Sequence, residues 1–212
     1  TVVPVISKAH TAGIKVIILD RGVQTSDYTT FINSDNIKIG AIGARYIAQQ
    51  LNGKGLVLLL EGIQSADVTK LRSKGFLDVM ANYPDIKIVK RTGNYLRKDA
   101  LIEMEKLVSD GVAVDAIFSE SDSMLSGVRS VLNRHKIDPS SIIMVGCDYT
   151  NEAREAIRAG SQTGSVLFPL GGKETVEIAV KMLAGESVPK HFSIPIEHLI
   201  TKKTVEIVPP IF

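Results

Sequence analysis

The 212-residue sequence contains few residues of several informative kinds, and each scarcity excludes a class of protein. Cys147 is its single cysteine, so an intrachain disulfide is impossible and cysteine usage does not indicate the redox compartment. Its 25 basic residues are nearly balanced by 23 acidic ones, without a dense basic block, so nucleic-acid binding receives no support from charge. No apolar run is long enough to span a bilayer, and the first residues lack the features of a signal peptide.

What the sequence does contain is a regular alternation of short apolar runs with longer helical patterns, which predicts parallel βαβ units and an α/β fold. No linker, internal repeat or low-complexity tract marks a boundary, so composition alone predicts one α/β unit. The expected strands cover residues 16–21, 29–32, 56–60, 86–90, 116–118, 142–145, 163–167, 192–196 and 199–207. The expected helices cover residues 2–10, 37–51, 66–82, 97–109, 124–135, 151–159 and 171–184, with Pro169 placed where the last one would begin and residues 33–36 as a turn and N-cap.

The stretch from Val16 to Leu19 reads as a buried parallel strand that ends abruptly in Asp20 and Arg21. Open α/β sheets bind ligands at the carboxyl ends of their strands. A carboxylate that only accepts hydrogen bonds, next to a guanidinium that only donates them, suits a polyhydroxylated small molecule. The alternative interpretation is a surface ion pair, which contributes little to stability.

Three further charged residues follow or flank predicted strands, and each also has a purely structural interpretation. Arg72 could lie on a solvated helix face, Asp122 could be a helix N-cap, and Asp148 could be an ordinary turn acid. Taken together they indicate more, because Asp20, Asp122 and Asp148 are all expected at the same end of a parallel sheet. A few charge-assisted hydrogen bonds of roughly 1.5–3 kcal/mol each would supply micromolar affinity for a small ligand.

Signals for catalysis, a metal or a cofactor are weak in this sequence. Neither Gly171-Gly172-Lys173 nor Gly40-Ala41-Ile42-Gly43 has the spacing of a phosphate-binding or dinucleotide-binding loop. The four histidines show no metal-ligand spacing, and Cys147 is expected to be a buried core residue. We therefore expect no catalytic residue, no metal and no cofactor.

The order and spacing of several motifs resemble the type I periplasmic sugar-binding proteins, of which ribose-binding protein is typical. The resemblance extends through essentially the whole sequence. It is carried by Ala12-Gly13-Ile14 before Val16 to Arg21, Ser34-Asp35-Asn36, Gly53-Lys54-Gly55, Glu61-Gly62, Arg72-Ser73-Lys74-Gly75-Phe76, Phe118 to Met124 with Gly127, Val145-Gly146-Cys147-Asp148 and Lys202-Lys203-Thr204-Val205.

This resemblance implies a two-lobed fold of parallel, doubly wound sheets whose lobes close around a monosaccharide. One lobe would contain residues 1–34 and 169–198, the other residues 35–168 and 199–212, with crossovers near Asn33-Ser34, Phe168-Pro169 and Glu197 to Leu199. The implied function is an extracytoplasmic, periplasmic-type solute-binding protein that delivers the sugar to the membrane components of an ABC importer. It would not span the membrane, bind nucleic acid or act as an enzyme.

The ligand-binding residues that the resemblance implies are assigned position by position. The family's Asp-Arg pair falls on Asp20 and Arg21, and its stacking aromatic residue falls on Tyr95. Two positions depart from the family pattern: Ser121 replaces a sugar-contacting asparagine, which could bring Asp122 closer to the ligand, and Phe168 replaces a glutamine and could stack on a sugar face. These departures argue against assuming that the sugar is ribose. The full expected set is Asp20, Arg21, Arg72, Tyr95, Ser121, Asp122, Asp148 and Phe168.

Two further expectations concern the start of the sequence and the competing functions. The family's first two βα units have no counterpart before Thr1, so the first lobe is expected to be incomplete and sugar affinity weak or absent. The alternative function is the effector-binding domain of a LacI-type repressor, which shares the fold and carries an N-terminal helix-turn-helix. Gly53-Lys54-Gly55 and the ending from Lys202 to Val205 favour the transport branch, and an enzyme of the doubly wound class would need a phosphate loop or catalytic constellation that we do not find.

Overall fold

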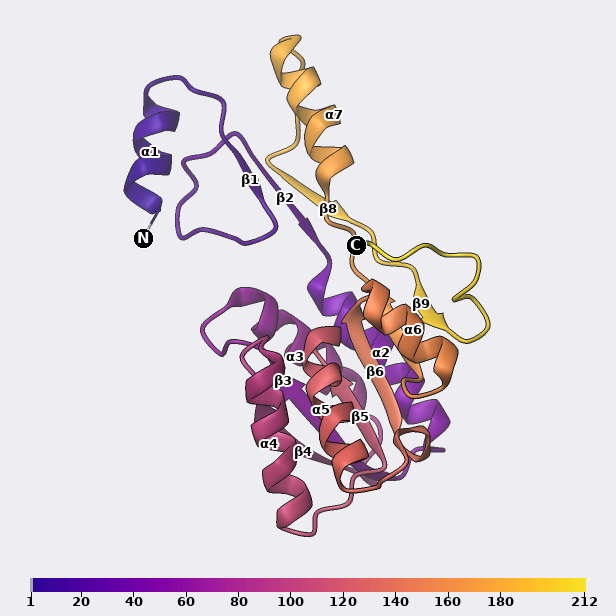
Figure 1. Ribbon diagram of the computed structural model, residues 1–212. Helices are drawn as coiled ribbons and strands as arrows, with labels where there is room; N and C mark the ends of the chain where they lie inside the picture. Colours follow the sequence, from indigo (N-terminus) through magenta and orange to yellow (C-terminus); the bar gives the residue numbers. More distant parts are fainter. Residues whose placement is uncertain (1) are drawn as a thin grey trace. The chain divides into compact units, whose positions relative to one another are not determined.

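The structure, a computed structural model, describes residues 2–212, and these residues form two compact units (Figure 1). Unit 1 consists of the chain up to Asp35 together with Pro169–Ile196, and unit 2 consists of Asn36–Phe168 together with Glu197–Phe212. The chain therefore passes between the units three times, after Asp35, Phe168 and Ile196. The single unit expected from composition is wrong, because chain segments far apart in the sequence build each unit and no linker composition marks the crossings.

Unit 2 is built on a six-stranded sheet in the order β4-β3-β5-β6-β7-β9. Its first five strands are parallel, and β9 pairs antiparallel to β7. The strands are β3 (Gly55–Glu61), β4 (Ile86–Thr92), β5 (Ala116–Ser119), β6 (Ile143–Asp148), β7 (Gly164–Leu167) and β9 (Leu199–Thr201). The helices are α2 (Asn36–Gln50), α3 (Asp67–Met80), α4 (Arg97–Ser109), α5 (Asp122–Arg134), the short 3-10 helix η1 (Pro139–Ser141) and α6 (Asn151–Ala159).

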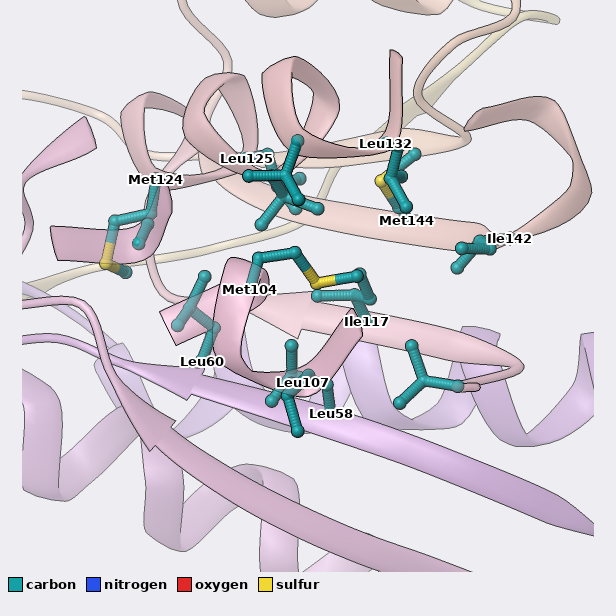
Figure 2. Close-up of a cluster of buried hydrophobic side chains, with 14 residues drawn as sticks. Leu58, Leu60, Met104, Leu107, Ile117, Met124, Leu125, Leu132, Ile142 and Met144 are labelled. Carbon is teal, nitrogen blue, oxygen red and sulfur yellow. The ribbon is translucent and has the colours of Figure 1, made fainter. Parts of the chain in front are cut away.

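Helices cover both faces of this sheet, which explains why its central strands are apolar without alternation. On one face, Leu58, Leu60, Ile117 and Met144 pack against residues of α4 and α5, as Figure 2 shows. On the other face, Phe118 of β5 stacks on Phe76 of α3, with 5.0 Å between ring centroids. The doubly wound parallel sheet expected from the sequence is confirmed in unit 2.

Helices α2 and α3 touch through two glycines, so their backbones approach closely. A Cβ atom on Gly40 would lie 2.0 Å from the carbonyl oxygen of Arg72, and one on Gly75 would lie 1.9 Å from that of Ile37. A backbone atom cannot move aside as a flexible side chain can. The Gly40 contact therefore sets where Arg72 lies relative to the sheet.

Replacing Gly40 with alanine is expected to destabilise unit 2 by about 1–3 kcal/mol, because overpacking at the α2–α3 contact outweighs the better helix propensity of alanine. The matched control is Gly172→Ala at the start of α7, where an added Cβ meets nothing within 4 Å. The free energy of unfolding from urea denaturation tests the pair. Equal values for both variants would show that the close approach carries no cost.

Unit 1 contains a small parallel sheet in the order β1-β2-β8. Its elements are α1 (Val3–Thr11), β1 (Ile17–Leu19), β2 (Thr30–Ser34), α7 (Gly172–Leu183) and β8 (His191–Ile194). Ile32 of β2, Ile178 and Met182 of α7, and Ile194 of β8 form its buried core. The core is modest because each strand has only three to five residues.

Three expectations about the elements are wrong in detail. β1 ends at Leu19, which is 41% exposed, so the strand is shorter and less buried than its apolar sequence predicts. Asn33 and Ser34 belong to β2 and not to a turn. Gly171, with φ of 74°, is the N-cap of α7, so Pro169 precedes the helix and does not begin it.

The expected long last strand, residues 199–207, is also wrong, since β9 ends at Thr201 and turns follow. The Thr204 hydroxyl accepts a hydrogen bond from the Thr201 amide, and the amides of Thr204 and Val205 both bond to the Thr201 carbonyl. These local bonds compete with pairing to a neighbouring strand, as is common for threonine.

Candidate ligand site

Polar side chains gather at the carboxyl end of the unit 2 sheet, where open α/β sheets bind ligands. Glu61 ends β3, Glu120 directly follows β5, and Asp148 ends β6. The backbone here adopts left-handed conformations that side chains disfavour, with φ of 107° at Asp148 and 61° at Tyr95. Such residues cost roughly 1–3 kcal/mol each and cluster at binding sites.

Arg72 of α3 is at the centre of this group and is only 4% exposed. Its Nε donates to Asn36 Oδ1 at 2.9 Å, and its Nη1 donates to the carbonyl oxygen of Glu120. Nη1 also lies 3.9 Å from Asp148 Oδ1, and the guanidinium lies over the Phe168 ring, 5.0 Å from its centroid. These contacts rule out the solvated helix face as the explanation of Arg72.

Asp148 keeps 22% of its side chain exposed, against 5% for Arg72, so of the two side chains it is the one that reaches the surface. Burial raises its pKa to about 7, although the neighbouring Arg72 acts in the opposite direction. Arg72 and Asp148 together present donors and an acceptor side by side, which is the combination that hydroxyl groups use. Phe168 is buried, and its ring lies against the Arg72 guanidinium, so it packs that group on one side.

Tyr95 lies beyond β4, and its ring packs directly over Gly62. A Cβ atom on Gly62 would lie 2.0 Å from the ring, so only glycine fits there. The Tyr95 hydroxyl forms a 2.8 Å hydrogen bond with Thr69 Oγ1 and lies 3.5 Å from Glu120 Oε2. Burial, followed by the charge of Glu120, raises the pKa of Tyr95 to about 12, so the hydroxyl stays protonated.

Ser121 and Asp122 are engaged within the protein. Ser121 is the N-cap of α5, and its Oγ accepts from the Met124 amide, so the N-cap role considered for Asp122 belongs to Ser121. The Asp122 carboxylate, in a residue only 3% exposed, has four donors: the amides of Tyr149 and Thr150, Ser165 Oγ and Gln162 Nε2. Burial raises its pKa to about 6 despite these donors. The geometry therefore gives Asp122 a structural task, which joins β5 to the ends of β6 and β7.

The glycine in the Val145-Gly146-Cys147-Asp148 motif follows from this arrangement. A Cβ atom on Gly146 would lie 1.9 Å from Asp122 Oδ1. Cys147 is fully buried, as expected from the sequence, and burial raises the pKa of its thiol. The motif thus places Asp148 at the edge of the site while making room for Asp122 behind it.

Asp20 and Arg21 lie in unit 1, at the end of β1. Asp20 has φ of 69°, the same left-handed backbone that marks the site in unit 2. Within residues 2–212 no ion pair joins Asp20 to Arg21, and Arg21 is exposed. The expectation that Asp20 ends a strand of the same sheet as Asp122 and Asp148 is wrong, because β1 belongs to the separate three-stranded sheet.

Sequence reasoning missed Glu120, and it used Asn36 as a turn and N-cap former and as part of a family motif but not as a site residue. Glu120 follows β5 directly, so the strand-end argument applied to Asp20 would also have identified it. Asn36 carried no such signal, because its contact with Arg72 joins two helices 36 residues apart. The described part of the chain contains no cluster of three or more His, Cys, Asp or Glu residues that could hold a metal ion. None of its helices combines the length and apolar character needed to cross a membrane.

Comparison with known proteins identifies where this architecture occurs. The family described as periplasmic binding protein domain matches residues 1–187. A ribose import binding protein of Bacillus subtilis is 28% identical over 194 residues, which cover 91% of this chain and 62% of that protein. A D-apiose import binding protein of Paraburkholderia graminis is 31% identical over 189 residues, covering 87% and 60% respectively.

Among solved structures, the periplasmic binding component of the arabinose ABC transporter from Shewanella sp. ANA-3 has a TM-score of 0.89 at 27% identity. The similarity covers 97% of this chain and 71% of that one. An ABC transporter solute-binding protein from Bacillus halodurans with bound myo-inositol has a TM-score of 0.87 at 26% identity, covering 96% and 71%. The chain thus spans about three fifths of the length of these two curated relatives and about seven tenths of these solved chains.

Proposed function

This chain belongs to the periplasmic binding protein family, and we propose that it binds a monosaccharide for delivery to an ABC importer. The relatives described above are binding proteins by name, and two of them are components of ABC transporters. In this role the chain acts outside the cytoplasm and does no chemistry on its ligand.

The observation that carries the proposal is the Arg72–Asp148 pair at the carboxyl end of the unit 2 sheet. Within residues 2–212, the guanidinium uses Nε and Nη1 for its protein hydrogen bonds, which leaves the Nη2 protons to donate to a ligand. The exposed part of the Asp148 carboxylate accepts. A sugar with adjacent hydroxyls matches both groups, because each hydroxyl donates and accepts.

Four other residues of the expected set have different tasks in this proposal. The Tyr95 ring is half-buried over Gly62, and its exposed part offers an apolar surface to the sugar ring. Phe168 packs against Arg72, and Ser121 caps helix α5. Asp122 accepts from the Tyr149 amide and so supports the turn after Asp148. Asp20 and Arg21 form the polar pair at the end of β1 in unit 1, and we propose, from the family resemblance, that they are ligand-binding residues of that unit.

Titration with a panel of pentoses, hexoses and myo-inositol, followed by amide NMR shifts, tests the proposed function. We expect saturable shifts around Arg72, Tyr95 and Asp148 with at least one member of the panel. Asp148→Asn, which removes the charge but keeps the shape, should weaken that binding by about 10–100-fold, since a charged hydrogen bond contributes roughly 1.5–3 kcal/mol. Asp138→Asn, an exposed cap of η1, is the matched control and should leave affinity unchanged.

The absence of saturable shifts with every sugar would contradict the proposal. A micromolar dissociation constant would support it and would contradict the expectation that affinity is weak.

A further inference from the structure

Two buried carboxyl groups, those of Glu61 and Glu120, meet at a single serine hydroxyl. Ser73 Oγ lies 2.9 Å from Glu61 Oε1 and 2.8 Å from Glu120 Oε1, both hydrogen-bond distances. A hydroxyl has one proton, so it donates to one carboxyl oxygen and can only accept from the other. Both contacts are hydrogen bonds only if one of the two carboxyl groups carries a proton.

The surroundings indicate which carboxyl group that is. Glu61 has charge-stabilising neighbours, with Lys90 Nζ at 3.7 Å and Gln64 Nε2 at 3.0 Å, and its side chain is 11% exposed. Glu120 is fully buried, and its Oε2 accepts from the Gly62 amide at 2.8 Å. Arg72 bonds to the Glu120 carbonyl oxygen and not to its carboxyl group.

The remaining Glu120 oxygen, Oε1, is therefore the atom that holds the proton. The bonds then run in one direction, from Glu120 Oε1 to Ser73 Oγ and from Ser73 Oγ to Glu61 Oε1. Burial raises the pKa of Glu120 to about 7, in agreement with this assignment.

We propose that Glu120, as a neutral carboxylic acid, is a positioning residue for the ligand site, and that its deprotonation weakens ligand binding. The chain of bonds joins the three parts that carry the site: α3 with Ser73 and Arg72, the end of β3 at Gly62, and Tyr95 beyond β4. Ionised Glu120 places a second negative charge beside Glu61 and leaves Ser73 Oγ with one proton for two carboxylates, so one of the two Ser73 hydrogen bonds is lost. The effect on ligand binding rests on the proposed function, whereas the protonation of Glu120 does not.

Several charged groups surround Glu120, and the experiment must separate their titrations. Arg72 on α3, Glu61 on β3 and the neutral Tyr95 beyond β4 act on Glu120 directly. Lys90 on β4 is paired with Glu61, and Asp148 on β6 is paired with Arg72. Two other buried carboxyl groups titrate in the same range: Asp148, whose pKa is also raised to about 7, and Asp122, whose pKa is raised to about 6. Asp148→Asn removes the first, and the second remains in every variant, so only the part of the signal that changes with Glu120→Gln is assigned to Glu120. The experiments therefore use Glu120→Gln in both the wild-type and the Asp148→Asn background.

The glutamine variant mimics the neutral acid, since its amide nitrogen donates to Ser73 and its oxygen accepts from Gly62. Infrared difference spectra between mildly acidic and mildly alkaline solution test the protonation without any ligand. We expect a neutral-carboxyl band in the Asp148→Asn protein that disappears at alkaline pH, is missing after Glu120→Gln, and shifts after Ser73→Ala. A neutral-carboxyl signal of unchanged size in the Glu120→Gln variant would overturn the assignment of the proton, whereas a smaller signal that titrates near pH 6 belongs to Asp122.

The second measurement is sugar affinity against pH, with a sugar that binds in the NMR panel. In the Asp148→Asn background, affinity should fall by up to about tenfold per pH unit as pH rises above neutrality, the limit for loss of one proton. Glu120→Gln should remove this dependence, whereas Glu186→Gln at an exposed position should keep it. An unchanged pH profile in Glu120→Gln would contradict the positioning role, and a missing infrared band would contradict the proposal even if no sugar binds.

Discussion

Replacing Asp122 with alanine is expected to lower the free energy of unfolding of unit 2 by about 3–5 kcal/mol, because several buried donors each lose a charged acceptor worth roughly 1.5–3 kcal/mol. The closest contacts are those of the Tyr149 amide and Ser165 Oγ, both at 2.7 Å, and of Gln162 Nε2 at 2.8 Å. Water has poor access to them, since Asp122 is almost fully buried. Amide hydrogen exchange of β5 and β6 under native conditions measures the loss within unit 2.

The matched control is Asp138→Ala, which removes an exposed aspartate that accepts from the Ser140 amide and hydroxyl. This change should cost about 1 kcal/mol, as for other caps. If Asp122→Ala costs no more than the control, the buried network does not stabilise the strand ends. That result would favour the interpretation of Asp122 as a ligand-contacting residue over its structural role.

Replacing Arg72 with alanine is expected to reduce sugar affinity at least 100-fold and to destabilise unit 2 by about 3 kcal/mol. The variant removes the donor from Asn36, Glu120 and Asp148 at once and leaves the Phe168 ring without its stacked guanidinium. It also takes away the positive charge that opposes the raised pKa of Asp148. Asp148 should then bind a proton at neutral pH, which limits the loss of stability but removes the charged acceptor.

The NMR titration and urea denaturation together measure both effects. Arg72→Lys keeps the charge but loses the planar fork, so it should recover part of the stability and little of the affinity. Arg134→Ala, on the exposed part of α5, should change stability by less than about 0.5 kcal/mol and leave affinity unchanged. A folded Arg72→Ala protein that binds sugar as tightly as the wild type would remove Arg72 from the site.

The burial of Glu120 also has a consequence for stability against pH. Its pKa rises from an ordinary value of 4.5 to about 7 on folding, so between these values the folded chain holds more protons than the unfolded one. The contribution of Glu120 to the free energy of unfolding is therefore fully present below about pH 4.5, and it is lost as pH rises through about 7. The Glu120→Gln variant should lack this slope.

Prediction from the sequence worked where local pattern and burial agree. The alternation of apolar runs and helical segments gave the parallel, doubly wound sheet of unit 2, because strands covered on both faces must be apolar throughout. Helix α4 and helix α6 have the bounds expected from the sequence, since Gly160, with φ of 80°, ends α6 and a strong helical pattern defines α4. The prediction of a buried strand over residues 16–21 was wrong, because an apolar run does not guarantee that another element covers it, and Leu19 is exposed.

The sequence by itself determined the fold class and the strand-end residues Asp20, Asp148 and Arg21, since a polar residue after an apolar strand is visible in one dimension. Only the tertiary structure decided what each polar group does. Asp122 and Asp148 have the same type of side chain, yet four donors within the protein bond to Asp122, whereas Asp148 stays partly exposed beside Arg72. The site of Arg72 depends on a backbone contact at Gly40, and the proton of Glu120 depends on two carboxyl groups meeting at Ser73. The hydrogen bonds of Asp122 and Ser73 join residues 12 to 47 positions apart, and no local pattern in the sequence specifies them.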